Sequence, residues 1–290
     1  MTQGSAELET SRLVVLHASG EGKPLFVFSG IYQGPELFHE MAGRLGERPV
    51  YGFQHIGARN ECPPVREVGL VAQLYAAELR RLQPHGPYHV FGHAFGGVIA
   101  FEIARELTMQ GEKIGLVMMA DCPAPGYPKP APYWRRARTH VQHLLAGGFA
   151  QQNRLDYVRE RLANVQKRFS RATGFVPAAV PVSIVPRHVQ RVHAALYEAM
   201  LYYAPLPQSV DVLFLTAETP PEWPTVVFDD PLLGWGPYLR GRISQCSVPG
   251  THLSIFAPDN VSVLTDRVRE ALGNLERAEA ARSHLSAKAL

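Results

Sequence analysis

Short apolar runs alternate along the chain with longer stretches in which apolar side chains recur every three or four residues. The short runs predict strands, and the longer stretches predict amphipathic helices. Strands are expected at 13–16, 25–28, 50–53, 88–91, 116–120, 212–215 and 243–248. Helices are expected at 36–45, 70–82, 95–110 and 261–275. This alternation is typical of an α/β protein with a mostly parallel sheet flanked by helices.

The stretch from Pro123 to about Pro207 does not follow this alternation. It shows no convincing strand, only proline-rich breaks and amphipathic patterns at 133–145, 155–169 and 188–203. Such a stretch is too long for an ordinary loop between two strands. We interpret 124–207 as a helical lid inserted into one domain that spans 1–290, with a separate small domain as the alternative. Residues 276–290, rich in alanine and charge, are expected to form a frayed helical extension.

Composition places the chain among soluble globular proteins, with 46% hydrophobic and 19% charged residues. No apolar run approaches the ~20 residues of a membrane span, and the first ten residues do not resemble a secretory signal. Cys62, Cys122 and Cys246 are widely spaced, which suits reduced thiols in the cytoplasm and gives no zinc pattern. We therefore expect a cytoplasmic protein with no metal and no membrane partner.

The net charge of +3 is too small to indicate nucleic-acid binding, but it is unevenly distributed. Residues 133–171 hold nine bases and two acids, which gives this segment a net charge of +7. A segment of this charge would attract an acidic partner, most strongly at low salt. A solvated face of arginine-rich helices is the alternative.

The sequence Gly92-His-Ala-Phe-Gly-Gly97 follows the predicted strand 88–91 and opens a helical pattern. Strand, sharp turn and helix with this glycine spacing indicate a nucleophile elbow, in which G-x-S-x-G exposes a serine hydroxyl. Here the residue at the top of the turn is Ala94, which has no nucleophile. A phosphate-binding loop would need further glycines or a Lys-Ser/Thr pair, which are missing. A tight turn without chemistry is the other alternative.

A serine at position 94 would need a base and an acid, and the chain offers candidates in the hydrolase order of nucleophile, acid and histidine. His252 follows the last predicted strand and a Pro-Gly pair, so it is the predicted base. His93 flanks the turn and is the rival. Asp121 directly follows the strand 116–120 and is the predicted acid, with Glu218 after strand 212–215 as the competitor.

An oxyanion hole needs two N–H groups aimed at the developing negative charge. The amide of Phe95, directly after the nucleophile position, is the first predicted donor. The second is expected in the loop 29–34, with Ile31 preferred to Tyr32 and a plain surface turn as the alternative. Tyr32 and His93 flank the expected pocket and are predicted to contact the substrate.

With these residues assembled, the chain resembles the type I thioesterase domains of nonribosomal peptide and polyketide synthases. The resemblance extends from Arg12 to about Leu272. Its motifs occur in order at 24–28, 48–53, 83–88, 92–97, 119–121 and 249–252. The loop 29–34 departs from the family pattern, because it carries bulky residues where the family has a proline and small glycines.

The resemblance implies an α/β-hydrolase fold and a Ser-His-Asp triad at positions 94, 252 and 121. It implies a substrate presented on the phosphopantetheine arm of an acyl or peptidyl carrier protein, and no other cofactor. Water would release the chain as an acid, and an internal hydroxyl or amine would release it as a macrocycle. The basic segment 133–171 would attract the acidic carrier protein.

Ala94 is the main departure from the family, and two histories fit it. Either a natural serine was replaced to make an inactive protein, or the chain is a natural pseudo-hydrolase that binds an acyl chain or a carrier protein. We favour the first, because an abandoned site has no chemical reason to keep Asp121, His252 and the glycines. A third option is that the two partners activate water directly.

Overall fold

The computed structural model describes residues 12–130, 132, 185–220 and 226–288. The chain forms two compact units. The first contains residues 1–128, 187–221 and 228–290, and the second contains 129–186 and 222–227. In the second unit, strand β6 (Lys129–Pro130) pairs antiparallel with β8 (Val226–Val227). The helices predicted at 133–145 and 155–169, and the basic segment 133–171, lie outside the described residues.

Within the described part of the first unit, seven strands form one sheet in the order β1-β3-β2-β4-β5-β7-β9. Among the described strands of this sheet, β1 runs antiparallel to its neighbour β3 and all the other pairs are parallel. The strands are β1 (Leu13–His17), β2 (Leu25–Phe28), β3 (Val50–Phe53), β4 (Tyr88–His93), β5 (Ile114–Ala120), β7 (Val212–Thr219) and β9 (Ile243–Thr251). The order reverses direction between β2 and β4, so the loops after these two strands face each other. Ligands in open α/β sheets bind at this kind of position.

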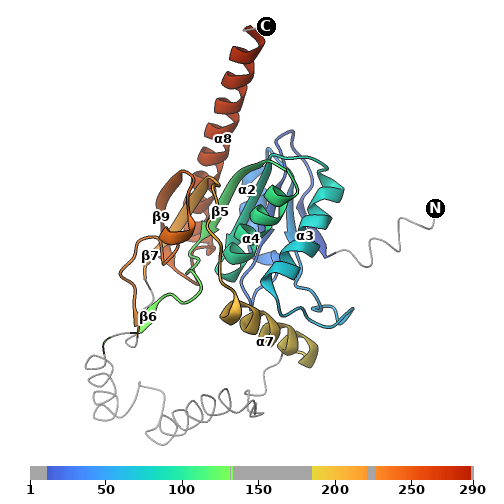
Figure 1. Ribbon diagram of the computed structural model, residues 1–290, viewed down its shortest axis with the longest axis vertical. Helices are drawn as coiled ribbons and strands as arrows, with labels where there is room; N and C mark the ends of the chain where they lie inside the picture. Colours follow the sequence, from blue (N-terminus) through green and yellow to red (C-terminus); the bar gives the residue numbers. More distant parts are fainter. Residues whose placement is uncertain (1–11, 131, 133–184, 221–225, 289–290) are drawn as a thin grey trace, which may run out of the picture. The chain divides into compact units, whose positions relative to one another are not determined.

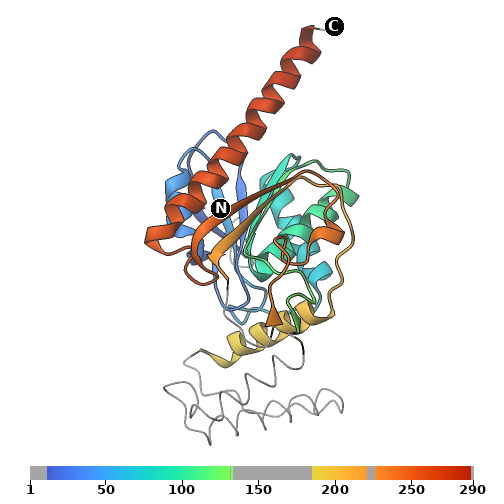
Figure 2. The same ribbon diagram turned by 90° about the vertical axis from the view of Figure 1, so that its left-hand side faces the viewer.

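Helices cover both faces of the sheet (Figures 1 and 2). The described helical segments of the first unit are η1 (Pro35–Phe38), α2 (His39–Leu45), α3 (Val68–Leu82), α4 (Phe95–Met109), α7 (Arg187–Tyr202), η2 (Gly236–Tyr238) and α8 (Pro258–Lys288). Helices α3, α4 and α7 share one hydrophobic cluster with one face of the strands. Helices α2 and α8 share a second cluster with the other face.

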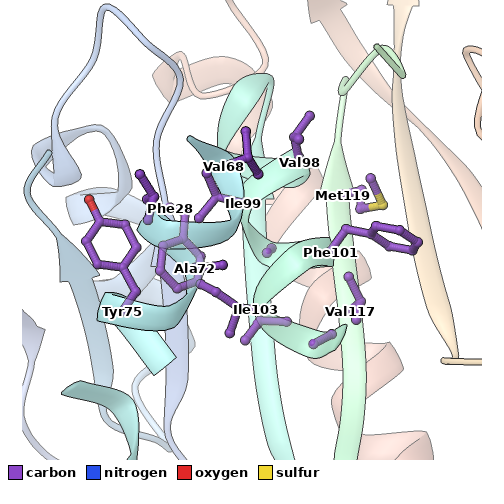
Figure 3. Packing of buried hydrophobic residues seen from close by; sticks show 14 of the residues in the cluster. Phe28, Val68, Ala72, Tyr75, Val98, Ile99, Phe101, Ile103, Val117 and Met119 are labelled. Carbon is purple, nitrogen blue, oxygen red and sulfur yellow. The ribbon is translucent and has the colours of Figure 1, made fainter. Parts of the chain in front are cut away.

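Burial explains why the helices pack in this way. In α3 the buried side chains recur at helical spacing, so one stripe faces the core. These side chains interlock with those of α4 and of β2 and β5 (Figure 3). β4 is buried along its whole length, which is typical of a central parallel strand covered on both faces. The strand before the turn between β4 and α4 and the helix after it are therefore both anchored in the hydrophobic core.

All seven predicted sheet strands and the helices predicted at 70–82 and 95–110 are confirmed, with shifts at their ends. The helix predicted at 36–45 is divided into η1 and α2, and α8 joins the helix predicted at 261–275 to the extension expected at 276–290, as far as Lys288. β4 extends to His93 and β9 to Thr251, because these residues pair with β5 and β7. The stretch after Pro123 was expected to lack strands, but β6 forms there. Helix α7 lies within two residues of the predicted 188–203, and it belongs to the same unit as the sheet. Among the described helices, none combines the length and apolar character needed to cross a bilayer.

Candidate active site

Ala94 lies at a sharp turn between β4 and α4, with φ 51° and ψ −123°. Such a conformation is rare for a residue with a side chain and is found at strained functional turns. The glycines make the turn possible. A Cβ on Gly92 would overlap the Gly96 carbonyl oxygen, and a Cβ on Gly96 would overlap the Phe28 carbonyl oxygen. The strand, the helix and β2 therefore meet too closely for side chains, as an elbow requires.

Asp121 and His252 meet at the carboxyl ends of β5 and β9. The Nδ1 of His252 lies 2.6 Å from the Oδ2 of Asp121, a charge-assisted hydrogen bond. The other carboxylate oxygen, Oδ1, accepts the N–H of Ala217 at 3.2 Å. Asp121 is 7% exposed, and its own N–H donates to the Leu215 carbonyl at 2.7 Å. The carboxylate is thus fixed by two strands and aimed at one imidazole.

Burial by itself would raise the pKa of the Asp121 carboxyl. The hydrogen bond and charge of His252, followed by the Ala217 N–H, outweigh burial and lower this pKa below its ordinary value. Asp121 is therefore ionised at neutral pH, and it can orient an imidazole and stabilise the imidazolium that forms when His252 takes a proton. Glu218, the competing acid, is exposed near the end of β7.

Two hydrogen bonds connect the Asp121–His252 pair to the elbow. The N–H of Ala94 donates to the carbonyl of Ala120, the residue before Asp121, at 3.0 Å. On the other side, His93 Nε2 lies 3.1 Å from the His252 carbonyl oxygen. Position 94 and the residue before it are thus held against the segments that carry the two partners. The structure brings Ala94, Asp121 and His252 to one edge of the sheet.

His93 was expected to contact the substrate, but its side chain is only 1% exposed. Its ring lies 4.9 Å from the His252 ring and edge-on to Phe256 at 5.0 Å, measured between centroids. Burial, followed by the nearby His252, lowers the pKa of His93 to about 3. His93 therefore lies between the loop that carries Gln33 and the loop that carries His252, where its buried side chain cannot contact a substrate directly.

The loop after β2 contacts the elbow through Gly30. A Cβ built on Gly30 would lie 3.4 Å from the Cβ of Ala94. The Gly30 carbonyl oxygen accepts the N–H of Gln33 at 3.2 Å and faces the Nε2 of His55 at 3.0 Å. These two donors fix the peptide group that joins Gly30 to Ile31, the residue predicted to donate the second oxyanion hydrogen bond.

The two predicted oxyanion donors, Phe95 and Ile31, have buried side chains, whereas the side chain of Tyr32 is exposed. The side chains of Phe95 and Ile31 are buried in the core, at 4% and 7% exposed, so only their backbone groups can take part. Tyr32 is 73% exposed and packs edge-on against His193 of α7, with ring centroids 5.0 Å apart. Tyr32 is therefore free to contact a ligand.

Three groups near the site were not anticipated from the sequence: the side chains of Gln33 and His55, and the N–H of Ala217. Gln33 and His55 are polar residues in otherwise ordinary loops, and nothing in their spacing marks them. Their contacts become visible only when the strand order places the loop after β3 beside the loop after β2, and β2 beside β4. No cluster of three or more His, Cys, Asp or Glu side chains suited to a metal occurs in the described part of the chain.

A mostly parallel sheet, a strained turn after a central strand and a paired aspartate and histidine at the same edge define an α/β-hydrolase. A family model for the thioesterase domain matches residues 23–272, and the chain belongs to this family. It is 26% identical over 270 residues to a dimodular nonribosomal peptide synthase of Bacillus subtilis (strain 168). The match covers 89% of this chain and 11% of that synthase.

Solved structures show the same fold. The four-domain nonribosomal peptide synthetase holo-AB3403 superimposes with a TM-score of 0.66 at 23% identity, over 92% of this chain and 21% of that one. The NocB thioesterase domain, in covalent complex with a fluorophosphonate nocardicin G analogue, superimposes with a TM-score of 0.61 at 20% identity. This match covers 90% of this chain and 99% of that one. At these identities the likeness concerns the fold alone.

Proposed function

We propose that this chain is a thioesterase domain whose parent form, with serine at position 94, releases an acyl, peptidyl or polyketide chain from a carrier protein. The observation that carries the proposal is the 2.6 Å hydrogen bond between His252 and Asp121, at the sheet edge that also holds the strained turn at Ala94. Membership of the thioesterase family and the likeness to synthetases support the reaction and the kind of substrate.

In the parent form, the hydroxyl oxygen of the serine at position 94 would attack the carbonyl carbon of the thioester while His252 takes the hydroxyl proton. The C–S bond then breaks, and His252 returns the proton to the departing thiol. A water molecule or an internal hydroxyl or amine, deprotonated by His252, then attacks the carbonyl carbon of the acyl-serine. The ester C–O bond breaks, His252 returns the proton to the serine oxygen, and an acid or a ring is released. The amides of Phe95 and Ile31 are proposed to hold the tetrahedral oxyanion in both steps.

Ala94 removes the atom on which this sequence of steps depends, so the chain as written is proposed to form no acyl-enzyme. Asp121, His252 and the elbow glycines remain in place, which favours replacement of a natural serine. The retained site would hold a substrate without turning it over. Hydrolases that lack a triad member keep only roughly 10³–10⁴-fold catalysis over water.

The test is the variant Ala94→Ser. We expect it to raise kcat/KM for small acyl thioesters by about 10³-fold or more, because loss of a serine nucleophile costs even more in related chemistry. Adding His252→Ala should abolish the gain. Adding His85→Ala should leave it unchanged, because His85 is exposed in the loop before β4, whereas Ala94 follows the other end of that strand.

Ala94 itself favours a second candidate, a natural pseudo-hydrolase that binds an acyl chain or carrier protein without catalysis. The same experiment separates the two. Under this second function, Ala94→Ser stays inert on a panel of thioesters and esters, while the unchanged chain binds an acyl-loaded carrier protein in calorimetry. Turnover by the serine variant would argue against it.

A further inference from the structure

His93 connects the loop that carries His252 to the loop that carries Ile31. Its Nε2 lies 3.1 Å from the carbonyl oxygen of His252, and its Nδ1 lies 3.1 Å from Oε1 in the side chain of Gln33. Gln33 in turn closes the loop after β2. Its N–H donates to the Gly30 carbonyl, and its carbonyl accepts the Ser29 hydroxyl at 2.8 Å.

The buried position of His93 decides which hydrogen bonds are possible. The ring is 1% exposed, and the titratable groups that influence it are His252 and Asp121. Burial and the neighbouring imidazole disfavour a second proton and lower the pKa of His93 to about 3. At neutral pH His93 therefore has one N–H group and one nitrogen that can only accept.

Its two neighbours are not equivalent. The carbonyl oxygen of His252 can only accept, whereas the amide of Gln33 can present its oxygen or its NH₂ group, because the two ends have the same shape. If Nε2 carried no proton, two lone pairs would face each other at 3.1 Å. The single proton therefore belongs on Nε2, and Gln33 satisfies Nδ1 by turning its NH₂ group toward it.

We propose that His93 is a positioning residue, held as the neutral Nε2–H tautomer, that fixes the backbone of His252 and, through Gln33, the Gly30–Ile31 loop. One imidazole thereby sets the distance between the predicted base and the predicted oxyanion donor. Its value for catalysis rests on the proposed function, whereas its tautomer and its hydrogen bonds do not.

The first test uses the chain as it is, with Ala94. Nitrogen-15 NMR of the histidine rings distinguishes the two neutral tautomers from the imidazolium. We expect the His93 ring to show a protonated Nε2 and an unprotonated Nδ1 from about pH 8 to about pH 5, a range above its lowered pKa, with slow exchange of the Nε2 proton. A protonated Nδ1, or an imidazolium in this range, would overturn the proposal.

The second test uses kinetics in the Ala94→Ser background. A glutamine side chain can place an N–H near the position of Nε2, and leucine cannot, so His93→Gln and His93→Leu form a matched pair. We expect His93→Leu to lower kcat by about 100-fold, the cost of a misplaced catalytic group, and to leave KM nearly unchanged. His93→Gln should recover most of the loss.

Two controls keep the outcomes separate. The first control is circular dichroism and urea unfolding of both His93 variants, which show whether they fold. The second is Gln33→Leu, which should lower kcat less than His93→Leu because the hydrogen bond between His93 and the His252 carbonyl remains. If His93→Leu in the Ala94→Ser background has the same kcat as Ala94→Ser alone, the positioning role is overturned. If Ala94→Ser is inert, the proposed function fails, and the NMR measurement still decides the tautomer.

Discussion

Ala94 keeps a backbone conformation that costs about 1–3 kcal/mol for most residues, and the surrounding turn has to hold it there. The glycines at 92 and 96 allow this by letting β2, β4 and α4 approach each other without side chains. The strain is therefore maintained by close backbone packing. Any added atom in this contact has to push the strand, the helix or the neighbouring loop away.

Gly96→Ala tests this contact. We expect it to lower the free energy of unfolding by about 3 kcal/mol or more, because the new Cβ overlaps the Phe28 carbonyl oxygen, a backbone atom that cannot rotate away. Gly43→Ala is the matched control. Gly43 is exposed in α2, and no atom lies within 4 Å of a Cβ built there. Alanine at this position should therefore raise the free energy of unfolding, by at most about 1 kcal/mol. Urea unfolding measures both, and equal effects would contradict the packing argument.

At the scale of elements, α8 shows how distant parts of the chain hold a helix in place. Glu279 of α8 accepts hydrogen bonds from Lys23 at 2.9 Å and Lys113 at 2.8 Å, and Arg48 pairs with Glu276 at 3.0 Å. Lys23 and Lys113 lie just before β2 and β5. Burial alone would raise the pKa of Glu279, but the hydrogen bonds of Lys113 and Lys23 lower it to about 2.

Glu279→Gln is expected to destabilise the protein by about 1 kcal/mol at pH 7, since the pairs are partly solvated. A lowered pKa means that this contribution is complete above the unfolded value of about 4.3 and is lost as the pH falls toward 2. Glu270→Gln is the control, because Glu270 is exposed and pairs only with its helix neighbour Arg267 at 3.5 Å within the described part of the chain. Thermal unfolding at about pH 7 and about pH 3 should separate the two variants mainly at the higher pH.

Elements were the part of the structure that the sequence predicted best. Buried parallel strands such as β4 read as continuous apolar runs, and the carboxyl ends of such strands share an edge, so Asp121 and His252 could be placed together. Gln33 and His55 could not be found in this way, because their contacts depend on β2 lying between β3 and β4. The ion pairs of Glu279 likewise join residues far apart in the chain, and their pairing follows from the strand order.

For the whole molecule, the buried histidines make stability depend on pH. His89 is fully buried in β4, and neither ring nitrogen has a hydrogen-bond partner in the described part of the chain. Burial, followed by the charges of Arg48 and Lys23, lowers the pKa of His89 to about 4. Unfolding restores the ordinary value of about 6.5, so the unfolded chain binds an extra proton between these two pH values.

The free energy of unfolding should therefore fall as the pH is lowered from about 6.5 to 4, with His89 contributing on the order of 3 kcal/mol. His89→Leu is expected to flatten this part of the profile. It should be neutral or stabilising at pH 7, because it removes two unpaired buried nitrogens. His39→Gln, exposed at the start of α2, is the control and should leave the profile unchanged. An unchanged slope in His89→Leu would contradict the argument.

Helix α8 begins at Pro258, shortly after the loop that carries His252, and reaches, at Glu279, the lysines that precede β2 and β5. It therefore extends along the strands from their carboxyl ends, where Ala94 lies, to their amino ends, and it continues beyond the sheet (Figure 1). A linker attached after Lys288 would leave the protein on the side away from Asp121 and His252. Immobilised on a sensor chip by this end, the domain would present its candidate site to whatever flows past.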